Sequence, residues 1–367
     1  MLFLNKIIKN NIMYIILFFF LVGCISEAES QYNYINESFE KNEIELKLIA
    51  TDTLKGESFY FSQFLHRSFL KDENIIIIDG KFCRSIIYDL KSRNFSVIDE
   101  NRFPQFEDCI HTVSKKKDTL EIFYSHGLKK ILSLDDTLTS VLNFNTNEKE
   151  VHASHDLPIS MLSNDLILVP TGVNIIHNSA YAKEAMDIRD PISYMKDQYL
   201  FALFNEDGQL INQFGRFPGV YHIPDLRQNS HKSYHYSVLD NKIYVAFAQT
   251  AVVQIYSLYG DLLETIHFQL PKFEELYNKN PKEGFYNAID GFAVEKLNNK
   301  VNYYFKTIHP KKREQLLVKV DLGNQIINYS SVKLPIGLMM PSVIQGKWMY
   351  MNIPWDDEPI ILKTFQF

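Results

Sequence analysis

A pair of apolar strands joined by a turn recurs six times along this chain of 367 residues, and this repeat constrains the fold more than any other feature. In three of the pairs the two strands begin 11 residues apart, and successive pairs begin between 44 and 77 residues apart. A four-stranded blade of a β-propeller takes about 40–50 residues, so the repeat predicts an all-β propeller. The first strands begin at Asn74, Asp118, Asn164, Asn241, Asn299 and Gly346, and the second strands span 85–90, 129–134, 199–204, 252–257, 316–321 and 360–365.

Six pairs indicate six blades, although the length of the chain alone allows six, seven or eight. Two intervals between pairs are wide because they hold insertions, at Pro170–Gln198 and Lys272–Gly284. The continuous apolar run at 75–78 is typical of a strand covered on both faces, as strands between neighbouring blades are. A seven-bladed propeller and a β-sandwich are the alternatives, and the recurring 11-residue offset argues against the sandwich.

The two ends of the repeat region both have strand character. Ile44–Ala50 alternates apolar and polar residues, and the chain ends within the apolar segment Ile360–Phe367. Pairing the first of these segments into the last blade would close the ring and remove an exposed sheet edge. We therefore expect the N-terminal and C-terminal strands to share one sheet.

The first 23 residues have the pattern of a bacterial export signal. Lys6 and Lys9 precede the apolar run Ile12–Val22, which is shorter than the ~20 residues needed to cross a bilayer. Leu21-Val22-Gly23-Cys24 resembles the lipobox of bacterial lipoproteins, and this resemblance implies cleavage before Cys24 and attachment of a diacylglycerol, palmitate included, to its sulfur. We expect a signal peptide at 1–23, a flexible tether at 24–42 and a propeller domain at 43–367.

The whole repeat region resembles the six-bladed propeller lipoproteins of the Bacteroidetes type, which include a domain-of-unknown-function group of about this length. The segments that carry the resemblance are VVQIYSLYGDLLETI (252–266) and INQFGRFPGVY (211–221), and the second is similar to the blade connectors of NHL and TolB-like propellers. Position 25 is Ile rather than Asp, which in the lipoprotein family argues against retention in the inner membrane, so we expect an outer-membrane lipoprotein that faces the periplasm or the cell surface. The propeller resemblance implies no catalytic or ligand-binding residue.

A search for chemistry finds few candidates. Cys83 and Cys109 either form a disulfide, which an exported protein permits, or remain free thiols. The His pairs at 152/155 and 231/235 lack the setting of a metal site, and no phosphate loop, dinucleotide turn or hydrolase elbow is present. Trp348 is expected in the core, and Trp355 and Arg216 in exposed turns or connectors. We expect no cofactor, no metal and no catalytic residue.

The sequence therefore favours a non-catalytic binding or scaffold module held at the bacterial cell envelope. Its expected partners are the membrane, through the lipid anchor, and an envelope protein or small ligand. The formal net charge of −6 disfavours nucleic acid, because such sites need clustered Lys and Arg. The alternative function is a hydrolase or lactonase-like propeller enzyme with a metal ion at the channel mouth.

Overall fold

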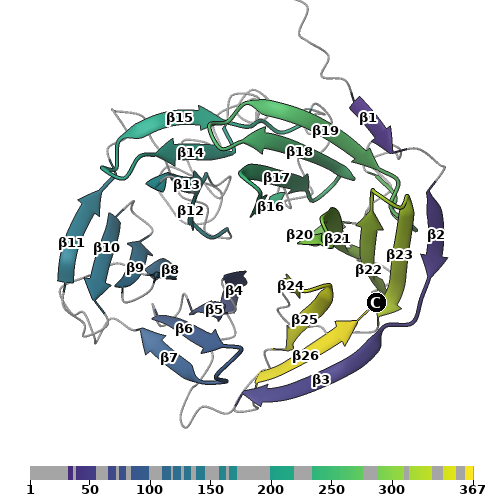
Figure 1. The fold of residues 1–367 in the computed structure, drawn as a ribbon, viewed down its shortest axis with the longest axis horizontal. Helices are drawn as coiled ribbons and strands as arrows, with labels where there is room; N and C mark the ends of the chain where they lie inside the picture. Colours follow the sequence, from purple (N-terminus) through teal and green to yellow (C-terminus); the bar gives the residue numbers. More distant parts are fainter. Residues whose placement is uncertain are drawn as a thin grey trace, which may run out of the picture.

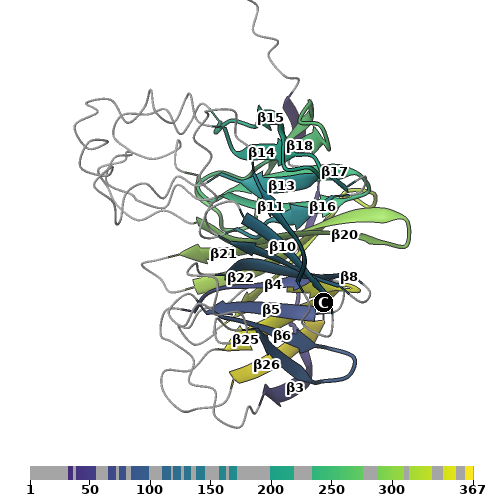
Figure 2. The same cartoon turned by 90° about the vertical axis from the view of Figure 1, so that its left-hand side faces the viewer.

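The computed structural model describes an all-β chain whose strands run across the thickness of a ring (Figures 1 and 2). The described residues are 32–35, 39–54, 65–71, 74–79, 84–98, 110–116, 119–124, 128–133, 138–144, 157–162, 165–171, 199–218, 234–275, 288–309, 314–332, 342–352 and 360–366.

Within these residues the strands form six sheets, mainly antiparallel, each of which runs from an inner strand near the ring axis to an outer strand (Figure 1). Three of the sheets come from the first half of the chain. The first holds β4 (Leu65–Lys71), β5 (Asn74–Asp79), β6 (Arg84–Asp89) and β7 (Phe95–Ile98); the second holds β8 (Ile110–Lys116), β9 (Thr119–Tyr124), β10 (Leu128–Ser133) and β11 (Leu138–Asn143); the third holds β12 (Ser160–Met161), β13 (Ile167–Pro170), β14 (Phe201–Phe204) and β15 (Leu210–Phe214).

The other three sheets combine the second half of the chain with the N-terminal segment. The fourth holds β16 (Tyr234–Leu239), β17 (Lys242–Phe247), β18 (Val252–Ser257), β19 (Leu262–Phe268) and β1 (Tyr32–Ile35); the fifth holds β20 (Ala288–Leu297), β21 (Lys300–His309), β22 (Glu314–Asp321), β23 (Ile326–Val332) and β2 (Glu40–Glu43); the sixth holds β24 (Ser342–Ile344), β25 (Lys347–Asn352), β26 (Ile360–Gln366) and β3 (Lys47–Leu54). The chain is thus an all-β propeller, as its repeats predict.

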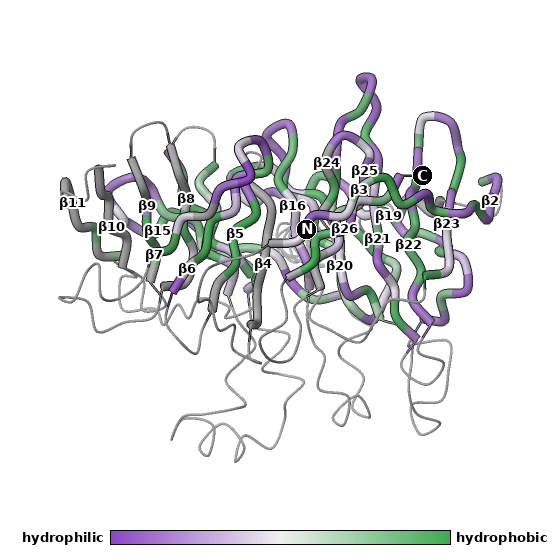
Figure 3. Tube along the Cα trace, turned by 90° about the horizontal axis from the view of Figure 1, so that it is seen from below, coloured by the Kyte–Doolittle hydropathy of each residue, from purple (hydrophilic) through white to green (hydrophobic). Residues whose placement is uncertain are grey.

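The core lies between neighbouring sheets, where strands such as β6, β14 and β17 are largely buried on both faces. Phe201, Phe247, Phe268 and Phe305 have no exposed surface, and the rings of Phe268 and Phe305 meet at 5.1 Å between centroids. Burying a Phe or Ile side chain contributes about 1.5–3 kcal/mol relative to leaving it in water. Figure 3 shows the resulting pattern edge-on, with hydrophobic strand interiors and hydrophilic turns at one rim.

The ring closes where the two ends of the described chain share the sixth sheet. β3 pairs antiparallel with β26, and the register joins Leu362 to Asp52 and Gln366 to Lys47. The expected pairing of an N-terminal strand with the C-terminal strand is therefore confirmed. β3 supplies the outer strand of a sheet whose other three strands lie at the other end of the sequence.

The segment 24–42, expected to be a flexible tether, differs from that expectation in its described part. β1 pairs in parallel with β19, and β2 pairs in parallel with β23, so each adds a fifth strand outside a complete sheet (Figure 1). An added edge strand is held by backbone hydrogen bonds, which need no apolar periodicity in the sequence. The polar composition of this segment therefore gave no sign of the pairing.

The two faces of the ring differ in the length of their connections. Turns between the first and second strands of a sheet, and between the third and fourth, take two to five residues, as at 240–241, 298–299 and 322–325. We call the face that carries them the short-turn face. The longest connections, 144–159, 171–200, 215–233 and 269–287, all join strand ends at the opposite face, which we call the long-connection face.

Candidate functional site

The long-connection face is the candidate functional site, because both insertions predicted from the sequence join strand ends there. Pro170 ends β13 and Phe201 begins β14, whereas Lys272 follows β19 on the path to β20. Binding residues concentrate on loops held by a rigid scaffold. Residues 172–198 lie outside the described residues, so the described part of this face consists of the strand ends and of the segments next to them.

A cavity of about 310 Å³ opens at this face between the fourth and fifth sheets. Its walls come from the segment after β19 and from the facing ends of β21 and β22, and the lining residues are Lys272, Phe273, Glu274, Thr307, His309, Glu314 and Leu316. Its volume is at the lower end of the range for small-molecule sites, ~300–1,000 Å³. Its lining mixes charged and apolar side chains, which suits a small polar ligand or the side chain of a partner protein.

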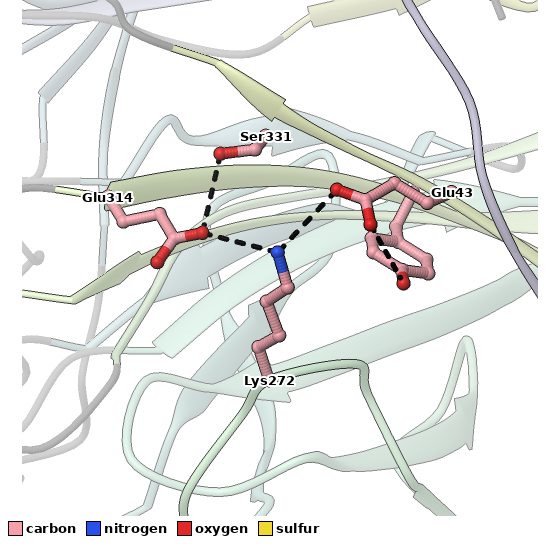
Figure 4. Close-up of polar contacts among 5 residues, drawn as sticks. Glu43, Lys272, Glu314 and Ser331 are labelled. Atoms are coloured by element: carbon pink, nitrogen blue, oxygen red, sulfur yellow. Dashed lines mark hydrogen bonds and ion pairs between the residues drawn. The ribbon is translucent and has the colours of Figure 1, made fainter.

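Lys272 lies at the edge of this cavity and joins three separate parts of the chain (Figure 4). Its Nζ lies 3.4 Å from Glu314 Oε1 at the start of β22 and 3.5 Å from Glu43 Oε1 at the end of β2. Ser331 Oγ donates to the same Glu314 oxygen at 3.3 Å, and Tyr329 Oη donates to Glu43 Oε2 at 3.4 Å. The cluster therefore ties the N-terminal segment to the cavity wall.

The electrostatics of Lys272 follow from these contacts. Partial burial lowers the pKa of the amine, but the hydrogen bonds and charges of Glu314 and Glu43 outweigh that effect and raise the pKa above its ordinary value. The side chain stays a cation at physiological pH and holds its two carboxylate partners. Because all three side chains are well exposed, the ion pairs contribute only ~0–1 kcal/mol to stability.

A second charged pair lies nearer the ring axis on the same face. Lys306 of β21 is only 3% exposed, and its Nζ contacts Asp290 Oδ2 at 2.6 Å. Asp290 lies at a register shift between β20 and β21, where the pairing passes from Ile289 to Gly291. Such bulges re-aim a side chain and are common next to functional sites. Here the bulge brings a half-exposed carboxylate to a buried cation.

A buried His–Glu pair includes Glu275, the residue that follows the cavity-lining segment 272–274. His267 Nε2 of β19 is 2.6 Å from Glu275 Oε1, and both side chains are largely buried. The other carboxylate oxygen of Glu275 is buried without a hydrogen-bond partner among the described residues. The pair fixes the segment 271–275 against β19 and so shapes the cavity wall.

The residues singled out in the sequence have different outcomes. Cys24, Cys83 and Cys109 lie outside the described residues, as do Trp355 and the His pair 152/155, so these predictions remain predictions. Of the described candidates, Trp348 is 1% exposed and packs edge-on against Tyr304 in the core, as expected. The Arg216 guanidinium lies 3.9 Å above the Tyr199 ring, and His235 Nε2 is 3.2 Å from the backbone oxygen of Ile289.

The charged residues of the long-connection face were not identified from the sequence. Lys272, Glu314 and Asp290 occur among many charged residues at the ends of strands, and nothing in their spacing sets them apart. Of these residues, only Lys306 could have been noticed in the sequence, because it interrupts the otherwise uncharged run Val301–Ile308. A lysine within a strand buried on both faces requires a carboxylate partner.

Among the described residues, no three His, Cys, Asp or Glu side chains are grouped to hold a metal ion. No helix in the described part of the chain has the length and apolarity to span a bilayer.

Comparison with known proteins supports the fold alone. No protein-family model matches the chain, and no curated protein matches it in sequence. Among solved structures, a protein named as exported from Bacteroides fragilis is 8% identical, with a TM-score of 0.53 and coverage of 89% of this chain and 98% of its own. A luciferin-regenerating enzyme (9% identity, TM-score 0.47, covering 87% and 95%) and BamB from Moraxella catarrhalis (9%, 0.42, 88% and 100%) are more distant.

Proposed function

We propose that this chain is a lipid-anchored, six-bladed β-propeller that binds a partner at the bacterial cell envelope without catalysing a reaction. The observation that supports this proposal is the difference in connection length between the two faces of the ring. Short turns close one face, whereas the longest connections all join strand ends at the other. A scaffold with this asymmetry presents one variable surface for recognition. The partner is an envelope protein or a small ligand.

The export pattern at 1–23 and the lipobox-like sequence before Cys24 support the anchored location. Two or three acyl chains hold a protein stably at a membrane, whereas a single chain does so only marginally. The described structure agrees with this arrangement in one respect, because Tyr32 is already paired to the ring and only residues 25–31 separate it from Cys24. The proposed lipid site and the folded domain are therefore close together.

The anchor is tested by metabolic labelling with a palmitate analogue. Wild-type protein should be labelled, and Cys24→Ala should lose the label. Cys83→Ala is the matched control, since it removes another cysteine of the same chain and should keep the label. Equal labelling of the wild type and Cys24→Ala would contradict the proposed lipidation.

The binding role is tested by capture from detergent-solubilised membranes. In one variant, residues 172–198 are replaced by a short Gly-Ser linker; in the control, the β14–β15 turn at 205–209 on the short-turn face is replaced by another five-residue turn. We expect the first variant to lose the proteins captured by wild type and the control to retain them. If both variants capture the same proteins as wild type, the insertion is not the recognition element.

A further inference from the structure

Exposed apolar side chains gather in the half of the ring next to the short-turn face. Each of them lies at the start of an outer strand (β3, β15 or β19), in the β18–β19 turn, or near the end of the inner strand β16. The large apolar side chains that are more than a third exposed in the described residues are Leu48, Ile49, Ile211, Val238, Tyr259, Leu262 and Leu263.

The densest part of this surface lies on the fourth sheet. Tyr259, Leu262 and Leu263 are 56%, 43% and 52% exposed, and we call these three residues the outer-rim patch. Tyr259 belongs to the β18–β19 turn, and the two leucines begin β19. The pairing of β18 with β19 shifts register at this place, passing from Glu264 to Leu262, so Leu263 is the extra residue of a bulge.

The turn that presents the patch is held firmly. Ser257 Oγ donates to Asp261 Oδ2 at 2.9 Å and accepts from the backbone N–H of Asp261 at 3.1 Å. From the neighbouring third sheet, Asn212 Nδ2 donates to the Tyr259 backbone oxygen at 2.8 Å. The exposed side chains are therefore displayed by a fixed backbone, and no ordering of that backbone is needed when they contact a partner.

The N-terminal segment approaches the ring beside this patch. β1 runs parallel to β19 with Tyr32 opposite Thr265, so the N-terminal end of β1 points toward the end of β19 that holds Leu262 and Leu263. Cys24 lies eight residues before Tyr32, which limits the distance between their Cα atoms to about 28 Å. A folded domain of this length has a radius of gyration of ~20 Å, so its ring is wider than that reach. Cys24 is thus confined to the side of the ring that carries the patch.

We propose that the outer-rim patch rests on the lipid bilayer into which the acyl chains of Cys24 insert. This inference deepens the proposed function and depends on the lipidation of Cys24. Tyrosine and leucine suit the boundary between headgroups and acyl chains, where an aromatic ring meets both. The carboxylates of Asp261 and Glu264 adjoin the patch, so the contact is apolar and needs no anionic lipid. The ring is then tilted, with the fourth-sheet edge of the short-turn face on the membrane and the long-connection face turned away from it toward the partner.

The test places a fluorescent reporter on the patch of the full-length acylated protein. Leu263→Trp carries the reporter at the patch. Ser92→Trp carries it at the exposed β6–β7 turn, which lies on the same face of the ring but in the sheet opposite (Figure 1). Each protein is reconstituted into phosphatidylethanolamine-rich vesicles with or without lipids brominated on their acyl chains, which quench tryptophan by contact. The native fluorescence of Trp348 and Trp355 is subtracted using wild-type protein.

We expect brominated lipid to remove at least about half of the fluorescence added by Leu263→Trp and almost none of that added by Ser92→Trp. If the acylated protein floats with the vesicles but both reporters respond equally, or only Ser92→Trp responds, the proposed seating is wrong and the anchor stands. If the wild-type protein carries no acyl label and does not float, the anchor itself fails, and the seating fails with it. Circular dichroism of each variant verifies that the fold is kept.

Discussion

At the scale of single residues, backbone conformations with positive φ make the short turns that separate the blade strands. Asp240 and Asn241 both have positive φ, as do Asn298 and Asn299, and such pairs are what two-residue hairpin turns of type I′ require. In the sequence these Asn residues marked the beginnings of apolar strands. In the structure they lie in the turns that join the inner strands β16 and β20 to the buried strands β17 and β21.

Gly260 provides the first prediction at this scale. Its φ is +98°, and a Cβ at this position would lie 2.4 Å from Phe214 Cγ in the neighbouring sheet. Gly260→Ala should therefore lower the free energy of unfolding by about 2–4 kcal/mol, through backbone strain and a steric clash together. The control is Gly346→Ala, where φ is +72° but the closest atom is 3.4 Å away, so only the strain of ~1 kcal/mol remains. Urea unfolding measures both changes, and equal losses would contradict the clash.

The Asp290–Lys306 pair gives a second prediction, which depends on the burial of one partner. Asp290→Asn leaves the buried cation without a counter-charge and should destabilise the fold by about 2–3 kcal/mol, less than for a fully buried pair because Asp290 is 48% exposed on its side chain. Lys306→Met removes the charge and keeps most of the volume, so it should cost less. Thermal or urea unfolding of the two variants shows which substitution destabilises the fold more. A larger loss in Lys306→Met would show that the amine stabilises the fold by more than its pairing with Asp290.

At the scale of elements, the sequence identified the buried strands and the outer strand that closes the ring, and it missed the inner strands. Each of the six predicted strand pairs corresponds to the second and third strands of a sheet, for example β17 with β18 and β21 with β22. These strands lie between neighbouring sheets, so they need continuous apolar runs, and such runs are easy to recognise. The inner strands, such as β16 with its largely half-exposed side chains, carry no comparable pattern.

The N-terminal strands show a further limit of sequence reasoning. β3 was predicted because its alternation and the need to close the ring coincide. β1 and β2 join complete sheets through backbone pairing, and the exposed and half-exposed side chains of β2 contribute no apolar pattern. The same limit applies to the cavity at Lys272, whose walls come from segments far apart in the sequence.

Deleting strands separately tests how much each contributes to the fold. A chain that ends at residue 359 lacks β26, so it loses the sheet partner of both β25 and β3 and the closure of the ring. We expect it to lose cooperative unfolding. A chain that begins at residue 36 lacks only β1, an added edge strand, and should keep a cooperative transition with a melting temperature lower by at most a few degrees. Thermal melts followed by circular dichroism compare the two, and a cooperative transition in the first chain would contradict the role of closure.

At the scale of the whole molecule, the two faces of the ring separate its two proposed roles. The exposed large apolar side chains of the described residues lie in the short-turn half, toward which the N-terminal end of β1 points, whereas the cavity and the longest connections lie at the opposite face. In the proposed arrangement, the ring between the two faces sets the distance of the recognition surface from the membrane. The sequence could predict the ring and the insertions. Only the order and direction of the strands in the structure show that the long connections share one face and the short turns the other.

Buried tyrosines give the whole molecule a predictable response to alkaline pH. Burial raises the pKa of Tyr350 to about 12, and burial is also the main cause that raises the pKa of Tyr234, Tyr236 and Tyr303. Tyrosines of the unfolded chain ionise near pH 10. Between pH 10 and 12 the folded chain therefore holds more protons than the unfolded chain, so the free energy of unfolding falls as pH rises.

This contribution to stability should be fully present below about pH 9 and should be lost progressively above pH 10. Urea unfolding measured at intervals between pH 8 and 12 tests it. In Tyr350→Phe one ionisable group is removed from the core, so the decline with pH should be shallower than in wild type, whatever the stability of the variant at neutral pH. Tyr259→Phe, which makes the same substitution at a tyrosine that is 56% exposed, is the control for the loss of the hydroxyl itself. Parallel declines in wild type and Tyr350→Phe would mean that ionisation of Tyr350 does not drive the alkaline loss of stability.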